Sequence, residues 1–305
     1  MVGVLEGGEC VVQQKTIGRR LTAGSIYLLL ALLALLCIIP LLNVLAISFS
    51  STKAIDQGLV TLWPVEFSVR AYHYVTGNST FMTSAAVSLK RVFLGTIINM
   101  VLTVLVAYPL SLESKNFKPR TWYVWFFVFT MLFHGGLVPN YVVVTQTHLI
   151  DTIWALIIPG AVPIFNVVLV LNFMRGLPKE LAESAFIDGA GHWKLLGRII
   201  VPLSKPVLAT VMLFTVVGHW NEWFAGIIYM NSPKHYPLAS FLQTVMVSID
   251  ITKIGNPIEL AELVKLNNRA IRAAEIFLAA LPVLLVYPFL QRYFITGIVM
   301  GSVKE

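Results

Sequence analysis

The sequence predicts an all-α integral membrane protein, and its composition carries that prediction. Of the 305 residues, 57% are hydrophobic and only 12% are charged. Soluble domains carry about 25% charged residues, because a surface that faces water needs them. The mean hydropathy of +0.79 points the same way. The chain has too few polar residues to cover a core, so lipid must be the solvent over much of its surface.

Six segments are long and apolar enough to be transmembrane helices, each of which needs about 20 mostly apolar residues. The first exceeds the core of a signal peptide, which spans about 7–15 residues, and is therefore interpreted as a spanning helix. The polar segment Ser51–Ala86 is expected outside, with Phe81–Leu89 as a short interfacial helix. The six segments are Leu21–Phe49, Val87–Leu112, Thr121–Val144, Thr152–Met174, Val207–Met230 and Ala273–Phe294.

The distribution of basic residues predicts that both termini are cytoplasmic. The net charge of +7 is scattered rather than gathered in a stripe, so nucleic acid is not expected as a partner. The short loop with Lys115, Lys118 and Arg120 is strongly basic, and such loops stay inside, beside anionic lipid. Residues 1–20 are expected to form a cytoplasmic amino-terminal segment, and residues 21–305 one membrane domain. The two cysteines do not suggest a disulfide framework.

The loop at about 177–206, between the fourth and fifth spans, predicts a helix-turn-helix on the cytoplasmic side. A loop of this length should have structure of its own. Pro178 suits the first turn of a helix, and Gly189 and Gly191 bracket a break. A second helix is expected from His192 to about Val201, where prolines stop it.

Two interpretations of this loop stand side by side on the residues alone. Its small side chains would let another protein approach the backbone, with Phe186 filling a pocket and Glu183 and Asp188 pairing with basic groups. Alternatively, the loop is an amphipathic hairpin that lies on the membrane.

The loop resembles the EAA motif of bacterial ABC importer permeases. The matching residues are Glu183-Ser184-Ala185, Asp188-Gly189-Ala190, Ile200-Val201-Pro202-Leu203 and Pro206. Ser184 stands where the family usually has alanine. The WNEW stretch of span five and the ending at 288–305 are similar to the MalG-type subunits of binding-protein-dependent carbohydrate importers. In that family this loop is the coupling helix, which docks in a cleft of the ATP-binding subunit. The resemblance implies coupling roles for Glu183, Ser184, Ala185, Phe186, Asp188, Gly189, Ala190, Gly191 and Pro202.

The resemblance also implies the function and the partners. The chain would be a permease subunit of an ATP-driven importer that translocates a sugar or oligosaccharide across the bacterial cytoplasmic membrane. A second homologous permease would complete a heterodimer, two copies of an ATP-binding subunit would hold Mg-ATP, and an extracytoplasmic solute-binding protein would deliver the sugar. The sequence has no G-x-x-x-x-G-K-[ST] loop and no H-E-x-x-H metal motif. The chain itself is therefore expected to be no enzyme and to hold no cofactor or metal.

Polar residues inside spans are costly and are candidates for the solute pathway. For the span-five residues, an interfacial belt and helix–helix hydrogen bonding are alternatives. For the others, the alternative is a packed kink with hydrogen bonds to neighbouring helices. A short outer helix at Pro257–Lys265 has basic residues that could attract an anionic oligosaccharide, although a solvated face explains them too. The candidates are His134, Asn140, Asn166, Asn172, Trp220, Asn221, Glu222 and Trp223.

Three other functions remain open at this point. A secondary transporter would need buried ion ligands, and Glu222 is the carboxylate placed well within a span. A receptor or scaffold subunit would show no solute flux. An importer permease for a peptide or polyamine is compatible with the EAA-like loop.

Overall fold

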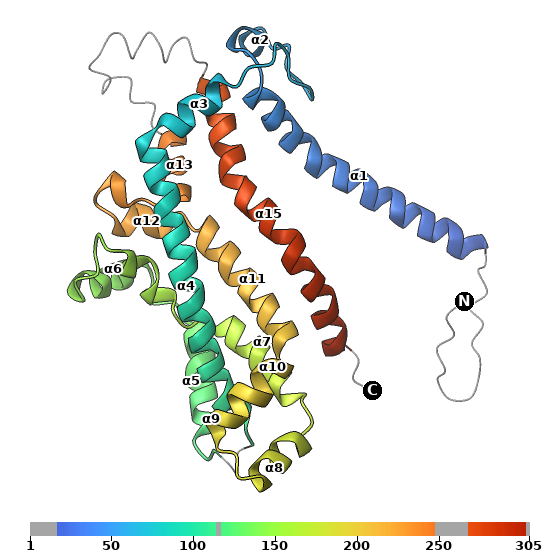
Figure 1. Cartoon of the computed structure of the whole chain (residues 1–305), viewed down its shortest axis with the longest axis vertical. Helices are drawn as coiled ribbons and strands as arrows, with labels where there is room; N and C mark the ends of the chain where they lie inside the picture. Colours follow the sequence, from blue (N-terminus) through green and yellow to red (C-terminus); the bar gives the residue numbers. More distant parts are fainter. Residues whose placement is uncertain (1–16, 114–116, 248–267, 303–305) are drawn as a thin grey trace. The chain divides into compact units, whose positions relative to one another are not determined.

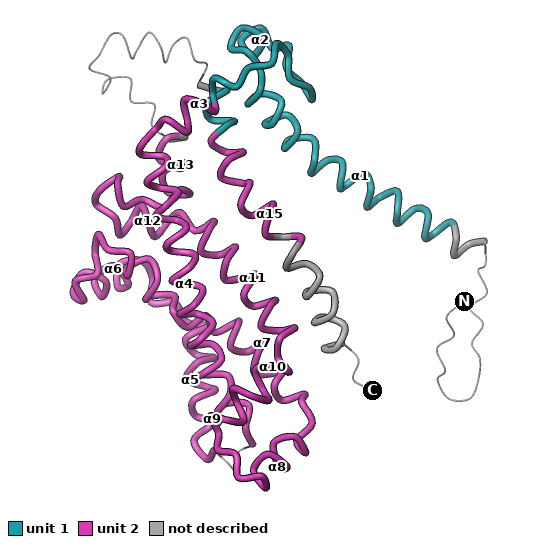
Figure 2. The backbone as a smooth tube through the Cα atoms, viewed as in Figure 1, with its two compact units in different colours: residues 1–71, 261–274 teal, residues 72–260, 275–305 magenta. Residues whose placement is uncertain are grey.

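The computed structural model describes residues 17–113, 117–247 and 268–302, and these residues contain helices and no strand. The prediction of an all-α chain is therefore confirmed over the described ranges. The chain divides into two compact units (Figure 2). Unit 1 comprises Met1–Ala71 and Ala261–Ala274, and unit 2 comprises Tyr72–Leu260 and Glu275–Glu305.

Unit 1 consists mainly of one long apolar helix, α1 (Ile17–Ser48), which contains the first predicted span. Its segment Leu21–Ser48 has a hydropathy of 2.9, and its most apolar window has no residue buried within the protein. A leucine-rich helix with apolar residues on every side suits a lipid environment. A short helix, α2 (Thr52–Asp56), follows it and begins where the Ser51 side chain accepts a hydrogen bond from the Ala54 amide at 3.2 Å.

The second predicted span is part of α4 (Ser79–Ser111), a helix of 33 residues that follows α3 (Arg70–Gly77). Asn78 begins α4, since its side-chain oxygen accepts the amides of Thr80 and Phe81 at 2.9 and 3.3 Å. The separate interfacial helix expected at 81–89 is instead continuous with the span. No proline or glycine interrupts the chain between residues 79 and 94, so nothing ends the helix there.

The third and fourth predicted spans are not straight helices. The third divides into α5 (Arg120–Leu132) and α6 (Leu137–Gln146), which meet at 114°. Gly136, with φ of +92°, lies in the break. The fourth consists of two 3₁₀ turns, η1 (Ile153–Leu156) and η2 (Ile158–Gly160), followed at 46° by α7 (Ile164–Arg175). Prolines at the turns explain this division, because a proline interrupts the α-helical hydrogen bonds.

The fifth predicted span is also broken, between α11 (Lys205–Asn221) and α12 (Phe224–Tyr229). By length and composition, two helices of the described part of the chain are long enough to cross a membrane, or up to five if each bent pair counts as one span. After α12 come η4 (Pro233–His235), α13 (Leu238–Val247) and α15 (Asn268–Ser302). Helix α15 contains the sixth predicted span. The predicted outer helix at 257–265 lies outside the described residues.

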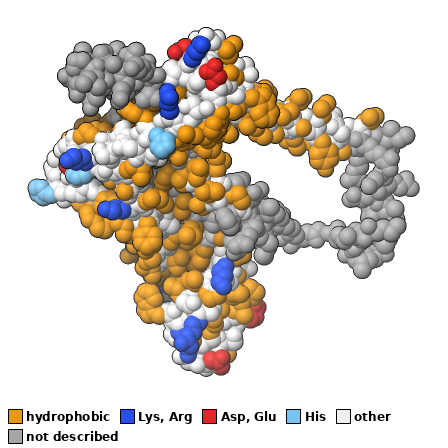
Figure 3. All heavy atoms as spheres, turned by 45° about the horizontal axis from the view of Figure 1, so that its top comes forward, with side chains coloured by type: hydrophobic (Ala, Val, Ile, Leu, Met, Phe, Trp, Pro, Cys, Tyr) orange, Lys and Arg blue, Asp and Glu red, His pale blue; other side chains and the backbone are white. Residues whose placement is uncertain are grey.

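The core of unit 2 forms where α4, α7 and α11 pack against one another (Figure 1). Ala107, Val170 and Val211 are fully buried there, one from each helix. The middle of the surface of unit 2 is largely hydrophobic in Figure 3, whereas Lys, Arg, Asp and Glu side chains gather at its lower end. This distribution fits a body that crosses lipid and ends in water.

Candidate functional site

The EAA-like loop folds as two helices joined by a tight turn, at the end of unit 2 where α4 and α5 meet (Figure 1). The first helix is α8 (Glu180–Ile187), and the second begins with α9 (His192–Leu195). We call residues 180–203 the 180–203 hairpin. Glu180 and Glu183 lie in the first turn of α8, near the positive end of the helix dipole. The helix-turn-helix expected from the sequence is present in the structure.

Gly189 ends α8 in a conformation that favours glycine. Its φ is +73°, which lies in the left-handed region. The amide of Gly189 donates to the Phe186 carbonyl at 3.0 Å, and the amide of Ala190 donates to the Ala185 carbonyl at 2.9 Å. These bonds satisfy the last carbonyls of the helix. Gly191 has an ordinary φ of −78°, so the turn depends on Gly189 rather than on both glycines.

The sequence predicted that prolines stop the second helix of the hairpin at about Val201, but the helix does not stop there. It continues through a π-helical turn, η3 (Leu196–Ile200), into α10 (Val201–Leu203), and the chain then bends by 80° into α11. A π turn changes the hydrogen-bond pattern just before Pro202, whose ring has no N–H and disfavours a regular helix. The hairpin is therefore joined directly to α11.

Polar contacts join the ends of α4 and α7 to each other and attach the hairpin, with Lys179 just before it, to the end of α4 and the loop that follows. Lys179, just before α8, forms an ion pair with Glu113, and the hydrogen bond and charge of this carboxylate raise the pKa of Lys179. Tyr108 Oη lies 2.8 Å from His192 Nδ1. Arg175 donates to the Leu110 carbonyl at 3.1 Å. The hairpin thus has a defined position on unit 2.

The structure distributes the predicted coupling residues between an inner and an outer face of the hairpin. Ala185 is 6% exposed and packs in the core cluster with Leu195 and Leu196. Phe186 is partly covered, because its ring lies edge-on to His192 at a centroid distance of 5.1 Å. Ala190 is half-buried, and the exposed members are Glu183, Ser184, Phe186, Asp188, Gly189, Gly191 and Pro202.

The two most exposed apolar side chains of the hairpin were missed by the sequence analysis. Ile187 is 86% exposed and Trp193 is 77% exposed, against 39% for Phe186. The sequence did carry a signal, since an isoleucine and a tryptophan flank the turn, on either side of the Asp188–Gly191 stretch. Both side chains are thus candidates for contact with another protein.

A salt bridge occupies the break in span five. Arg91 of α4 approaches Glu222 to 2.7 Å, and its side chain is only 3% exposed. The other carboxylate oxygen of Glu222 accepts the Ala225 amide at 2.8 Å. Glu222 therefore has an internal ion-pair partner while its side chain is still 36% exposed, and the solute contact considered for it stays a prediction. Arg91 was not among the sequence candidates, although a basic residue inside the apolar 87–112 segment was the available signal.

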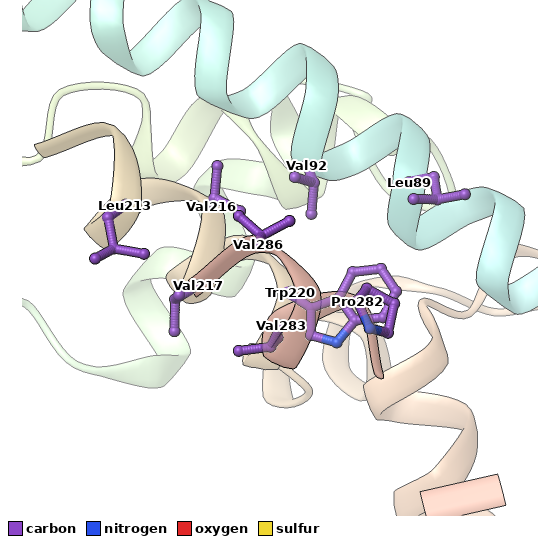
Figure 4. A pocket seen from close by; sticks show the side chains of 9 residues that line it. All are labelled: Leu89, Val92, Leu213, Val216, Val217, Trp220, Pro282, Val283 and Val286. Atoms are coloured by element: carbon purple, nitrogen blue, oxygen red, sulfur yellow. The ribbon is translucent and has the colours of Figure 1, made fainter. Parts of the chain in front are cut away.

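Two further pathway candidates form helix–helix hydrogen bonds. Trp220 is 9% exposed, and its Nε1 donates to the Ala279 carbonyl at 2.9 Å. Asn166 is 6% exposed, and its Nδ2 donates to Thr215 Oγ1 at 3.3 Å. Trp220 also borders a cavity of about 100 Å³ among apolar side chains of α4, α11 and α15 (Figure 4). These contacts favour the hydrogen-bonding alternative for both residues.

The remaining pathway candidates are exposed and are not gathered into one pocket. His134 lies in the break between α5 and α6, and Asn140 lies on α6. The Asn172 carbonyl accepts the Gly176 amide at 3.3 Å at the end of α7. Trp223 lies beside Phe224, and Asn221 borders a hollow of about 410 Å³ that α11, α13 and α15 form.

The loops at the other end of unit 2 are joined by Asp151. Its Oδ1 lies 3.0 Å from His235 Nδ1 and accepts the amides of Asn231 and Ser232 at 2.9 and 3.3 Å. The hydrogen bond from His235 lowers the pKa of Asp151 below its usual 3.8, and the two amides add to this effect. A lowered pKa means that the charged form stabilises the folded loop.

The contact at Asp151 should persist in mild acid and fail only in strong acid. A carboxyl with a lowered pKa contributes its stability above the usual value, and this stability is lost as pH falls through the lowered pKa. Hydrogen-exchange protection factors of the Asn231 and Ser232 amides should be constant from pH 7 to pH 5. They should decrease once the pH is below 3.8. Asp151→Asn should lower them at pH 7. Equal protection in the native chain and the variant would contradict the assignment.

Comparison with known proteins identifies relatives over most of the chain. Residues 79–300 match a family described as "Binding-protein-dependent transport system inner membrane component". The chain is 39% identical to the protein LplC of Bacillus subtilis (strain 168), over 88% of this chain and 89% of that protein. It is 36% identical to the polygalacturonan/rhamnogalacturonan transport system permease protein YtcP of the same organism, over 93% and 99%.

A solved structure is similar as well. It is described as the crystal structure of a bacterial ABC transporter involved in the import of the acidic polysaccharide alginate. The matched chain has a TM-score of 0.84 and 28% sequence identity, and the match covers 92% of this chain and 98% of the other. The similarity therefore extends over most of the chain.

Proposed function

The chain belongs to the family of binding-protein-dependent transport system inner membrane components, and we propose that it is the permease subunit of an ATP-driven importer for a sugar or oligosaccharide. The observation that carries this proposal is the near full-length similarity to YtcP, a permease whose name specifies polygalacturonan and rhamnogalacturonan. The family is one of transport subunits, so the chemistry of ATP hydrolysis belongs to a different chain.

We propose an acidic oligosaccharide as the solute. YtcP is named for polygalacturonan and rhamnogalacturonan, and the similar solved structure is described as an importer of the acidic polysaccharide alginate. These solutes share uronic acid units, whose carboxylates are negative at neutral pH. Uptake of labelled oligogalacturonides should therefore exceed uptake of neutral maltodextrins of equal length.

The proposed assembly follows from the family and from the helices. A second homologous permease forms a heterodimer with this chain, two ATP-binding subunits carry Mg-ATP, and a solute-binding protein delivers the sugar from outside. We propose six crossings with both termini in the cytoplasm: α1, α4, the bent helices of the third, fourth and fifth predicted spans, and the 35-residue α15. Basic residues at the hairpin end of unit 2, Lys118, Lys194 and Arg198 among them, support a cytoplasmic position for that end.

In this proposal the 180–203 hairpin docks in a cleft of the ATP-binding subunit. Ile187 and Trp193 supply exposed apolar anchors, and Glu183 and Asp188 supply charge for basic groups of the partner. The hairpin continues into α11, so a movement of the docked hairpin reaches the membrane-spanning helices. ATP binding would close the ATP-binding subunits and switch the pathway outward, and hydrolysis would reset it.

The partners can be identified directly. The chain, tagged and extracted in mild detergent, is expected to bring with it a second permease and a subunit with a phosphate-binding loop, detectable by mass spectrometry. A lone chain or a homo-oligomer, reproducible in several detergents, would count against the proposal. It would favour a secondary transporter instead.

Truncating Trp193 should weaken the attachment of the ATP-binding subunit. Buried anchor residues of an interface each contribute about 2 kcal/mol or more, which is roughly a 30-fold change in Kd. Trp193→Ala and Ile187→Ala are therefore expected to lower the amount of ATP-binding subunit recovered with the chain. Trp122→Ala is the matched control, because Trp122 is 64% exposed on α5 and lies outside the hairpin. Equal recovery with all three variants would remove both residues from the interface.

A further inference from the structure

Arg91 is a basic residue buried in a helix that the sequence assigns to the membrane. Its side chain is 3% exposed. A buried charge is costly unless it is paired and its donors are satisfied, and an ionisable residue inside a span is a candidate for function. Its guanidinium approaches three acceptors: the Glu222 carbonyl at 2.8 Å, Glu222 Oε2 at 2.7 Å and the Leu156 carbonyl at 3.4 Å.

These acceptors belong to two segments that are far from Arg91 in sequence. Leu156 ends η1, 65 residues away, and Glu222 follows the last residue of α11, 131 residues away. The planar fork of an arginine presents several donors in fixed directions, which suits a set of acceptors from different segments. Arg91 thus joins α4 to η1 and to the break in span five.

Glu222 connects the same contact to α12. One of its carboxylate oxygens binds Arg91, and the other accepts the Ala225 amide at 2.8 Å in the first turn of α12. Its own amide donates to the Gly218 carbonyl at 3.1 Å, at the end of α11. Glu222 therefore has one contact to each of the two helices that the break separates.

Two glycines near the break mark close approaches to neighbouring side chains. A Cβ at Gly95 of α4 would lie 2.4 Å from Nε2 of His219, and a Cβ at Gly226 of α12 would lie 2.1 Å from Oγ of Ser240. Ser240 also donates to the Trp223 carbonyl at 2.7 Å. A loose connection between α11 and α12 would not require glycine at both positions.

The break lies at the opposite end of α11 from the 180–203 hairpin. α11 has 17 residues and so spans about 25 Å. The hairpin enters it at Lys205, and Arg91 holds the residue that follows Asn221. A displacement of the hairpin along α11, or a rotation about its axis, is therefore transmitted to Glu222, which forms the ion pair with Arg91 of α4.

We infer that Arg91 is a positioning residue for transport: it holds the α11–α12 break against α4 through Glu222, and η1 against α4 through the Leu156 carbonyl, so that movement of the hairpin is passed to α12. This inference rests on the proposed function. Arg91 does not bind solute, because its charge is taken by Glu222. Without this attachment the ATP-binding subunit still docks on the hairpin, but the movement of the hairpin is no longer passed to α12.

The experiment compares Arg91→Met and Glu222→Gln with the native chain in the reconstituted complex. Both variants should retain the ATP-binding subunit, since the hairpin is unchanged, and should lose uptake per ATP hydrolysed by about tenfold or more, because breaking the buried ion pair removes the attachment of α12 to α4. Lys90→Met is the matched control: Lys90 is the exposed neighbour of Arg91 on α4. It should leave uptake per ATP unchanged.

A double variant, Arg91→Met with Glu222→Met, separates positioning from folding. Removing both charges leaves no unpaired buried ion, so the Tm should return toward that of the native complex. Uptake per ATP should stay low, because α12 remains detached from α4. Recovery of uptake together with the Tm would overturn the inference, as would normal uptake in both single variants. If the native chain retains no ATP-binding subunit, it is the proposed function that fails instead.

Discussion

Replacing Gly189 with valine is expected to abolish uptake and to release the ATP-binding subunit from the chain. Gly189 has a φ of +73°, where a side chain costs about 1–2 kcal/mol and a β-branched one costs more. A Cβ there would meet no atom within 4 Å, so the effect comes from the backbone rather than from a clash. The chain would relieve the strain by changing the turn, which moves α8 relative to α9.

The matched control for this variant is Gly197→Val. Gly197 lies in η3, also has open space around it, and has no positive φ. Valine is a better helix former than glycine, so this substitution should not weaken the hairpin. The measurement is the recovery of the ATP-binding subunit and the rate of uptake in the same membranes. Uptake by the Gly189→Val chain at the native rate would show that the turn is not part of the coupling surface.

Replacing Gly95 with valine is expected to destabilise unit 2 strongly. A Cβ at this position would lie 2.4 to 2.8 Å from three atoms of the His219 ring, well inside contact distance. Overpacking of a closed interior costs about 1–3 kcal/mol, and sometimes more. Because His219 is three residues before Glu222, the same displacement would disturb the contact with Arg91. The Tm of the detergent-solubilised chain should fall.

A rescue variant tests whether the clash itself is the cause. Gly95→Val combined with His219→Ala removes the obstructing ring and should recover most of the lost Tm. Gly218→Val is the control, because Gly218 lies in α11 next to His219 and has open space for a Cβ. If the double variant is no more stable than Gly95→Val alone, the close approach of α4 and α11 does not explain the destabilisation.

Composition and apolar length predicted the all-α fold and the approximate position of the apolar helices. They could not predict the breaks, which depend on tertiary contacts. At the break in span five, the Glu222 carboxylate accepts the Ala225 amide at the start of α12. Glu222 is itself held by Arg91, which is 131 residues away in the sequence. In span three, His134 and two glycines were noticed, but whether they kink the helix or bend the chain by 114° depends on the packing of α6.

The candidate site was predicted best where the residues act locally. Gly189 was identified as one of two glycines that bracket the break, and in the structure it has the positive φ at which α8 ends. Exposure was less predictable: Phe186 was expected to point outward, yet its ring packs on His192, while Ile187 is 86% exposed. Helical spacing identifies which residues share a face, but it does not indicate which face meets the rest of the protein.

The most direct test of the proposed importer is solute uptake by the purified complex in proteoliposomes. Labelled oligogalacturonide, the solute-binding protein and ATP are supplied separately and together, with Gly189→Val as the uncoupled variant. The proposal predicts uptake only when the binding protein and ATP are both present, and none with the variant. Uptake that proceeds without ATP, along an ion gradient, or that is unchanged in the variant would contradict it.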